Sequence, residues 1–234
     1  GSGNTSDQTV TISINDLDEI APTITGPSGS AGDGSSSKSI NENSTAVHTF
    51  TANESVTWSI NGGTDVGKFN INSSSGDLSF KTAPDYENPS DSDSNNSYVV
   101  GVRATDTSGN TSDQTVTLTV VDVDDLAPSI SGPSGSAGEA KSTKLINENT
   151  TAIYTFSADE TVTWSISGGD DKDKFSINSS TGTLSFKTAP DYETPNDTDK
   201  NNSYIVSVRA TDNASNISDQ TVTVTVADID EINP

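Results

Sequence analysis

The sequence has no cysteine and no methionine, and His48 is its only histidine. Without cysteine the chain can form no disulfide and no thiolate metal site, and it has no thiol nucleophile. A single histidine and the lack of a glycine-rich phosphate loop leave little for catalysis, so we expect that the protein is not an enzyme. Small secreted eukaryotic domains often carry disulfides, so the absence of cysteine favours a bacterial protein.

Basic residues are also scarce, because 11 Lys and Arg stand against 34 Asp and Glu, which gives a net charge of −23. Surfaces that bind nucleic acid or anionic membranes need clustered Lys and Arg. We therefore expect no nucleic acid partner and no membrane contact. No apolar run approaches the roughly 18 residues of a membrane span, and no signal peptide is recognisable. The acidic balance is compatible with divalent cations.

The chain repeats itself with an offset of 106 residues. Trp58 returns as Trp164, and "FKTAPDYE" at 80–87 returns unchanged at 186–193. Repeats of this kind indicate an array of domains, so we expect the chain to be an internal piece of a longer one. The expected domains are 1–16, the C-terminal strand of a preceding repeat; 17–122 and 123–228, two full repeats; and 229–234, the start of the next linker.

Each repeat has the texture of a β-sandwich, although hydrophobic residues make up only 29% of the chain. Short runs rich in Val, Ile, Thr and aromatics are separated by Gly, Ser, Asn and Asp, as strands are by turns. Residues 115–120 alternate strictly between polar and apolar, which predicts one buried face. About seven strands in roughly 100 residues is typical of an immunoglobulin-like sandwich. The strands expected in the first repeat are 45–52, 55–60, 68–71, 76–80, 97–105, 114–123 and a short one near 22–25.

Several aromatic and basic side chains have simple structural interpretations. Trp58 and Trp164 lie among apolar neighbours, which favours the core over sugar stacking. Tyr98 and Tyr204 are expected to begin a buried strand. Arg103 and Arg209 are expected to pair with nearby acids.

Acidic residues recur at strand ends, where they suit Ca²⁺, a cation that takes six to eight oxygen ligands. In an extended Asp-x-Glu both carboxylates lie on one side, as two ligands of one ion must. The simpler alternative is a solvated acidic surface. It does not explain why the acids recur at fixed positions while the loop "TDVGK" becomes "DDKDK". In the first repeat these acids are Glu42, Asp85, Glu87, Asp106, Asp122, Asp124 and Asp125.

A second candidate for Ca²⁺ is the Asp-x-Asp-x-Asn pattern at 91–95 and 197–201. It resembles the start of a calcium loop but lacks the following Gly and a distal bidentate Glu. A solvated turn between strands is the alternative.

Taken together, the motifs resemble the cadherin repeat, as found in large bacterial surface adhesins of the RTX type. The resemblance covers both repeats. In the first it rests on Glu42, on Asp85–Tyr86–Glu87, on Ala104–Thr105–Asp106 and on the linker "DVDDLAP" at 122–128. It implies an all-β fold of two tandem seven-stranded Greek-key β-sandwiches, joined end to end by Ca²⁺-binding linkers.

The resemblance also implies which carboxylates would hold Ca²⁺. At the middle linker, Glu42, Asp85, Glu87, Asp122 and Asp125 would hold two ions, and Asp124 with Asp212 would hold a third. The flanking sets would be Asp16, Asp18, Glu19 and Asp106 before the first repeat, and Glu148, Asp191, Glu193, Asp228, Asp230 and Glu231 after the second.

The sequence departs from the family pattern after the second strand, where cadherins carry Asp-x-Asp. Glu54 and Val56 stand there in the first repeat, and Glu160 and Val162 in the second. Glu54 and Glu160 are still expected as candidate ligands, and Asp159 as a substitute ligand in the second repeat. The middle linker is therefore expected to hold two or three ions.

The function implied by the resemblance is that of Ca²⁺-dependent structural extender repeats in a bacterial cell-surface adhesin, which supports adhesion and biofilm formation. The chain would be extracellular and monomeric, with neighbouring repeats of the same chain as its partners. Polysaccharide or a cell-surface ligand would be bound by other domains. Two alternatives stay open: an adhesive module that itself binds polysaccharide or another copy of the chain, and an inert spacer without ions.

Overall fold

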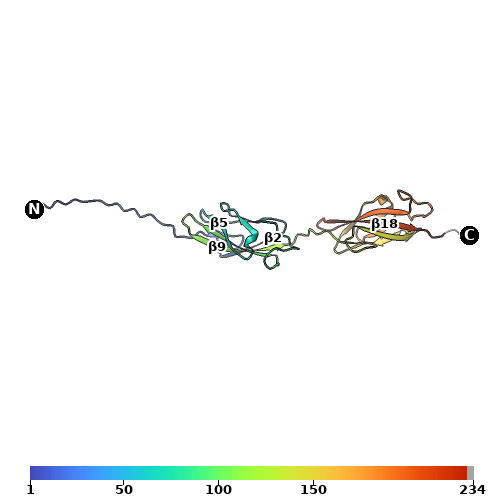
Figure 1. Cartoon of the computed structure of the whole chain (residues 1–234), viewed down its shortest axis with the longest axis horizontal. Helices are drawn as coiled ribbons and strands as arrows, with labels where there is room; N and C mark the ends of the chain where they lie inside the picture. Colours follow the sequence, from blue (N-terminus) through green and yellow to red (C-terminus); the bar gives the residue numbers. More distant parts are fainter. Residues whose placement is uncertain (231–234) are drawn as a thin grey trace. The chain divides into compact units, whose positions relative to one another are not determined.

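A computed structural model describes residues 1–230 of the chain (Figure 1). The described part is all-β and divides into two units, the first ending at Val123 and the second starting at Asp124. The sequence predicted this division one residue earlier. Each unit has its own hydrophobic core.

The first unit contains a four-stranded sheet in the order β2-β9-β8-β5 and a three-stranded sheet in the order β3-β7-β6, with a short β1-β4 pair. A single 3-10 turn, Val66–Lys68, precedes β6. The strands are β1 (Ile24–Thr25), β2 (Ser35–Asn41), β3 (Ala46–Thr49), β4 (Thr51–Ala52), β5 (Thr57–Gly62), β6 (Phe69–Ile71), β7 (Asp77–Phe80), β8 (Ser97–Thr105) and β9 (Thr111–Val121).

The second unit repeats this topology, with sheets β11-β18-β17-β14 and β12-β16-β15 and the pair β10-β13. Its turn is Lys172–Lys174. Its strands are β10 (Ile130–Ser131), β11 (Lys141–Asn147), β12 (Ala152–Thr155), β13 (Ser157–Ala158), β14 (Thr163–Gly168), β15 (Phe175–Ile177), β16 (Thr183–Phe186), β17 (Ser203–Thr211) and β18 (Ile217–Ala227).

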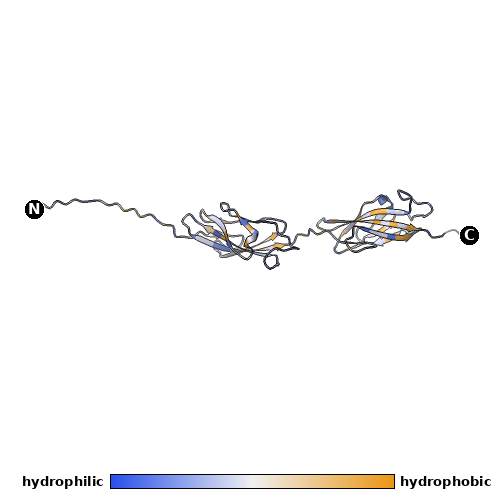
Figure 2. Cartoon of the chain, in the orientation of Figure 1, coloured by the Kyte–Doolittle hydropathy of each residue, from blue (hydrophilic) through white to orange (hydrophobic). Residues whose placement is uncertain are grey.

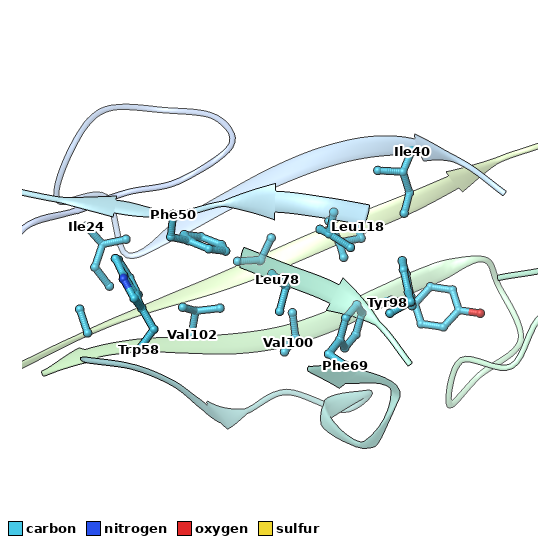
Figure 3. Packing of buried hydrophobic residues seen from close by; sticks show 14 of the residues in the cluster. Ile24, Ile40, Phe50, Trp58, Phe69, Leu78, Tyr98, Val100, Val102 and Leu118 are labelled. Carbon is cyan, nitrogen blue, oxygen red and sulfur yellow. The ribbon is translucent and has the colours of Figure 1, made fainter. Parts of the chain in front are cut away.

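The cores follow from the alternation that was read in the sequence, and the hydrophobic residues in Figure 2 lie mainly on the strands. Val100 of β8 faces Val116 of β9 across the ladder, and both are fully buried. A buried Val or Leu side chain contributes about 1.5–3 kcal/mol to stability. In Figure 3, Phe50 and Trp58 pack near Ile24, with their ring centroids 5.8 Å apart. The expected core positions of Trp58 and Trp164 are confirmed, at 4% and 5% exposure.

The strand β2 was not predicted from the sequence. Its residues, "SSSKSIN", have low β propensity. Only Ser36 and Ile40 are buried, and the rest of the strand is exposed. Pairing decides the structure here, because β2 lies parallel to β9 from Ser35↔Thr115 to Asn41↔Val121.

Residues 1–22 form no helix or strand, and they appear as the thin dark-blue stretch in Figure 1. The predicted strand within 1–16 is therefore absent. Its counterpart β9 is paired on both sides, by β2 and β8. Residues 1–16 have no such partners among the described residues, and a strand without a partner leaves its backbone groups to water.

Within residues 1–230, no helix has the length and hydropathy needed to cross a membrane.

Candidate metal centres

Four clusters of three carboxylates stand out in the described residues, and in each the ligand atoms lie within 4.8 Å of one another. We call two of them leading clusters, because each includes an acid that precedes the first strand of its unit. The other two are trailing clusters. The leading clusters are Asp18, Glu54, Asp106 and Asp124, Glu160, Asp212; the trailing clusters are Glu42, Asp85, Glu87 and Glu148, Asp191, Glu193.

The two clusters of the first unit lie near opposite ends of β8. Asp106 follows the last residue of β8. Asn96 precedes its first residue and donates from Nδ2 to the Tyr86 carbonyl at 2.8 Å, beside the trailing cluster. The nine residues of β8 span about 30 Å at roughly 3.3 Å a residue. One unit therefore offers one carboxylate cluster at each end.

The trailing cluster is built around Glu42, which follows directly after β2 and is 3% exposed. Its Oε2 accepts the Tyr86 N–H at 2.6 Å, and its Oε1 accepts the Val123 N–H at 2.8 Å. Asn43 adopts a left-handed φ of 61° and donates its N–H to the Pro84 carbonyl at 2.9 Å. Glu42 thus joins the end of β2, the segment before β8 and the chain leaving β9.

The second unit repeats this arrangement at Glu148, which is 2% exposed. Its Oε2 accepts from the Tyr192 N–H and its Oε1 from the Ile229 N–H, each at 2.8 Å. The hydrogen bonds from Thr194 lower the pKa of the neighbouring Asp191 carboxyl. These bonds favour the charged form of Asp191, which is the form that binds a cation.

The leading cluster of the first unit is held by Asn110. Asp106 accepts the Asn110 N–H and the Asn110 side-chain amide, each at 2.8 Å. The same amide donates to the carbonyls of Asp18, at 3.0 Å, and Ile20, at 3.3 Å. Desolvation raises the pKa of Asp106, but the hydrogen bonds from Asn110, Ser108 and Gly109 together outweigh it, and the pKa is lowered overall.

In the second unit Asn216 corresponds to Asn110. Its side-chain amide donates to Asp212 at 2.9 Å and to the Asp124 carbonyl at 3.1 Å. One amide in each unit therefore ties the chain before the first strand to the acid that follows the strand β8 or β17.

Glu54 and Glu160, the departures from the family pattern, both belong to leading clusters. Desolvation, and then the charges of Asp18 and Asp106, raises the pKa of Glu54. Desolvation, Asp124 and Asp212 do the same for Glu160. Carboxylates that repel in this way are suited to share a cation.

Asp159 lies outside the cluster that contains Glu160. Its Oδ1 accepts the Ser129 N–H at 2.7 Å. Asn53 does the same for the Thr23 N–H at 2.6 Å in the first unit. Asp159 thus occupies a position that a neutral amide fills equally well.

The remaining predicted ligands do not belong to the four clusters. They come from the segments before the first strand and after the last strand of each unit, and they are exposed. These residues are Asp16, Glu19, Asp122, Asp125, Asp228 and Asp230. Glu231 lies outside the described residues.

The Asp-x-Asp-x-Asn segments form turns whose acids bond within the turn. Asp91 is 6% exposed and accepts the N–H groups of Asn95, at 2.8 Å, and Asn96, at 3.2 Å. Asp93 accepts the side-chain amide of Asn95 at 2.7 Å. Asp197, Asp199 and Asn201 repeat these contacts.

The four clusters fit Ca²⁺ by their donor chemistry. Every side chain in them is a carboxylate, and a hard cation that takes oxygen ligands is the match for such a set. The Arg103–Asp113 and Arg209–Asp219 ion pairs, each at 2.7 Å, confirm the predicted pairing of the arginines and lie outside the clusters.

Sequence reasoning missed Asn110 and Asn216, the residues that tie the leading clusters together. A signal was present, because an Asn follows four residues after the acid in both "DTSGN" and "DNASN". It also missed the buried Gln114 and Gln220, which have no distinguishing neighbours in a strand of Thr and Val.

Residues 146–227 match the family model described as the cadherin domain. Among solved structures, the chain is similar to mouse cadherin-23 EC22-24, with 21% identity, a TM-score of 0.56, and coverage of 90% of this chain and 68% of that one. Human protocadherin-24 EC1-2 has 16% identity, a TM-score of 0.57 and coverage of 90% and 100%. The human desmocollin-1 ectodomain has 18% identity, a TM-score of 0.55 and coverage of 90% and 42%.

The structural likenesses show a common fold, and the domain match adds a sequence relation over the second unit. The cadherin-like fold also supports the predicted tandem sandwich architecture in both units. Together these findings show a cadherin-like fold in both units and a cadherin domain match in the second.

Proposed function

We propose that the two units are Ca²⁺-dependent extender repeats of an extracellular adhesin. Carboxylates of consecutive repeats hold Ca²⁺ at the linker and stiffen the connection. When bound, Ca²⁺ supplies positive charge and a sphere of six to eight oxygen ligands. The proposed ligands at the middle linker are Glu42, Asp85, Glu87, Asp122 and Asp125, together with Asp124, Glu160 and Asp212.

One observation supports this proposal above the others. The Val123 N–H is held by Glu42 of the first trailing cluster. Asp124, the next residue in the chain, belongs to the second leading cluster. Ligands of two clusters are thus attached to neighbouring residues of one short segment. Without a cation their charges repel, and the segment between them is free to flex.

The wider setting is part of the same proposal. A bacterial cell surface is supported by the absence of cysteine and by the close similarity of the two repeats. Extracellular modules bind Ca²⁺ at about 10⁻⁴–10⁻³ M, which suits sea water or tissue fluid. In that setting the repeats would hold a terminal binding domain away from the cell and so support adhesion and biofilm formation.

Calcium titration of the chain by calorimetry tests the proposal. We expect saturable binding, which Asp212→Asn weakens because it removes a charge from the second leading cluster. Asp173→Asn is the matched control, since Asp173 is an exposed carboxylate outside the clusters. Equal binding by both variants, or no binding at millimolar Ca²⁺, would overturn the assignment.

A further inference from the structure

We propose that a buried glutamine, Gln114, locks the parallel pairing of β2 with β9, here called the clamp, at the end where tension enters the unit. The counterpart in the second unit is the pairing of β11 with β18. The inference goes beyond the proposed function, because the clamp consists of protein contacts alone and requires no ion.

The direction of the strands sets how tension acts on each unit. Strands β2 and β9 run side by side toward the trailing cluster, over seven residue pairs. Tension on the two ends of a unit pulls β2 back toward the leading cluster and β9 away from it. The ladder is therefore loaded in shear, and its hydrogen bonds share the load. The β1-β4 pair, only two residues long, precedes the clamp and would yield first.

Gln114 lies at the end of β2 that receives this load. It is 1% exposed, and it directly precedes Thr115, where the parallel ladder begins. Its Oε1 accepts the Ser36 hydroxyl at 2.9 Å, and its Nε2 donates to the Asp33 carbonyl at 2.8 Å. A side chain of β9 therefore binds the chain on both sides of the first ladder pair, at Asp33 before β2 and at Ser36 within it.

The second unit has the same lock. Gln220 is fully buried and accepts the Ser142 hydroxyl at 3.0 Å. Its amide donates to the Glu139 carbonyl at 2.7 Å. Asp33 in one repeat and Glu139 in the other differ in side chain, and each serves the lock only through its carbonyl.

A glycine lets the chain pass over each glutamine. A Cβ on Gly26 would lie 2.0 Å from the Gln114 Oε1, and one on Gly132 would lie 1.8 Å from the Gln220 Oε1. The segment between β1 and β2 therefore lies directly against the amide. Burial of an amide is costly unless it is hydrogen-bonded, and here both of its polar atoms are satisfied.

The loaded end of β9 is held in a similar way. The Glu42 N–H donates to the Val121 carbonyl at 3.1 Å, and the Glu42 carboxylate accepts the Val123 N–H at 2.8 Å. Each strand of the clamp is therefore secured beyond the ladder at the end where tension reaches it.

Single-molecule force spectroscopy of the whole chain, pulled from its termini in chelator, tests the lock. Gln114→Leu with Gln220→Leu removes the hydrogen bonds to the Ser36 hydroxyl and the Asp33 carbonyl in the first unit. It removes those to Ser142 and Glu139 in the second. The comparison is Leu78→Ala with Leu184→Ala, which opens cavities in β7 and β16, outside the clamp. Urea unfolding measures the equilibrium stability of both variants.

For each unit of equilibrium stability lost, we expect the Gln→Leu variant to lose more unfolding force than the Leu→Ala variant. If the two variants lose the same unfolding force for the same loss of equilibrium stability, the proposed lock is overturned. If the glutamine variant fails to fold, Ser36→Ala with Ser142→Ala removes one bond of each lock and is read in the same way.

A change of pulling direction tests the clamp itself. Because the chain has no cysteine, Ser35→Cys with Thr115→Cys gives two unique handles across the first ladder pair. Pulling there peels the same hydrogen bonds one after another. We expect a several-fold lower force than between the termini, and equal forces in both directions would overturn the clamp. Chelator keeps this result independent of the Ca²⁺ proposal.

Discussion

At the scale of single residues, Glu42 serves the fold as well as the proposed ion. Its two oxygens accept backbone N–H groups from segments 44 and 81 residues away. A carboxylate oxygen has more than one lone pair, so each can accept an N–H and still face a cation. The fold thus orients this ligand before any ion arrives.

Two substitutions at Glu42 separate these roles. In chelator, Glu42→Ala should destabilise the first unit by about 1–3 kcal/mol, because it leaves two part-buried N–H groups without their acceptor. Glu42→Gln keeps one acceptor oxygen and should cost less, but it should reduce the stabilisation by Ca²⁺. Urea unfolding with and without Ca²⁺ measures both effects, with Asp173→Asn as the control. A full Ca²⁺ response in Glu42→Gln would contradict the assigned role.

The Arg103–Asp113 pair gives a prediction for pH. The hydrogen bond from Arg103 lowers the pKa of Asp113. The pair therefore stabilises the fold above the unfolded pKa of about 3.9, and its contribution is lost as the pH falls through the lower folded pKa. Because the two side chains are 40% and 48% exposed, Asp113→Asn should cost under about 1 kcal/mol at pH 7.

Urea unfolding at pH 7 and at about pH 3 tests this sign. The stability gap between the wild type and Asp113→Asn should shrink at the lower pH. A gap that stays constant or widens would show that the Asn side chain is costly for another reason.

At the scale of elements, hydrophobic alternation made β8 and β9 predictable, because most of their buried positions are Val, Leu or Tyr. β2 escaped prediction, because its stability comes from pairing with β9 rather than from its own serines. The predicted single strand at 45–52 is divided into β3 and β4 at Phe50. Pairing partners lie far apart in the chain, so local sequence does not reveal them.

The carboxylate clusters were predictable to the extent that acids recur at strand ends. Asp85, Glu87 and Glu42 were expected together and lie together. Glu54 and Glu160 were also expected as candidate ligands, although the family pattern has Asp there, and each lies in a leading cluster. Asn110 and Gln114 were missed, because the burial of a polar side chain depends on neighbours that only the folded chain supplies.

The segment between β1 and β2 gives a prediction about packing. Gly26→Ala should destabilise the first unit, since its Cβ meets the Gln114 amide. The addition of Gln114→Ala should recover part of the loss, because the obstacle is then gone. Gly63→Ala is the control, since it meets the Val99 carbonyl at 2.3 Å and has a φ of 98°. Gln114→Ala should not rescue that variant.

Urea unfolding in chelator measures the coupling between the two positions. Strictly additive effects of Gly26→Ala and Gln114→Ala would contradict the close packing of the segment against the amide.

At the scale of the whole molecule, the arrangement of ligands gives the repeats their proposed role. Each unit carries a leading and a trailing cluster, and in the proposed function the trailing cluster of one repeat and the leading cluster of the next bind Ca²⁺ at the linker. Binding to the folded state also adds stability by mass action, about 1.4 kcal/mol per site at ten times the Kd. We therefore expect the linker to stiffen and the folded state to gain stability over the same range of Ca²⁺ concentration.

Small-angle X-ray scattering of the chain in Ca²⁺ and in chelator tests the central claim most directly. We predict that Ca²⁺ extends and narrows the distance distribution of the wild type. In a variant with Asp85→Asn and Asp212→Asn, which removes one charge from the first trailing cluster and one from the second leading cluster, this change should be lost. Identical wild-type curves in the two buffers would contradict the account and leave the acids as a solvated surface.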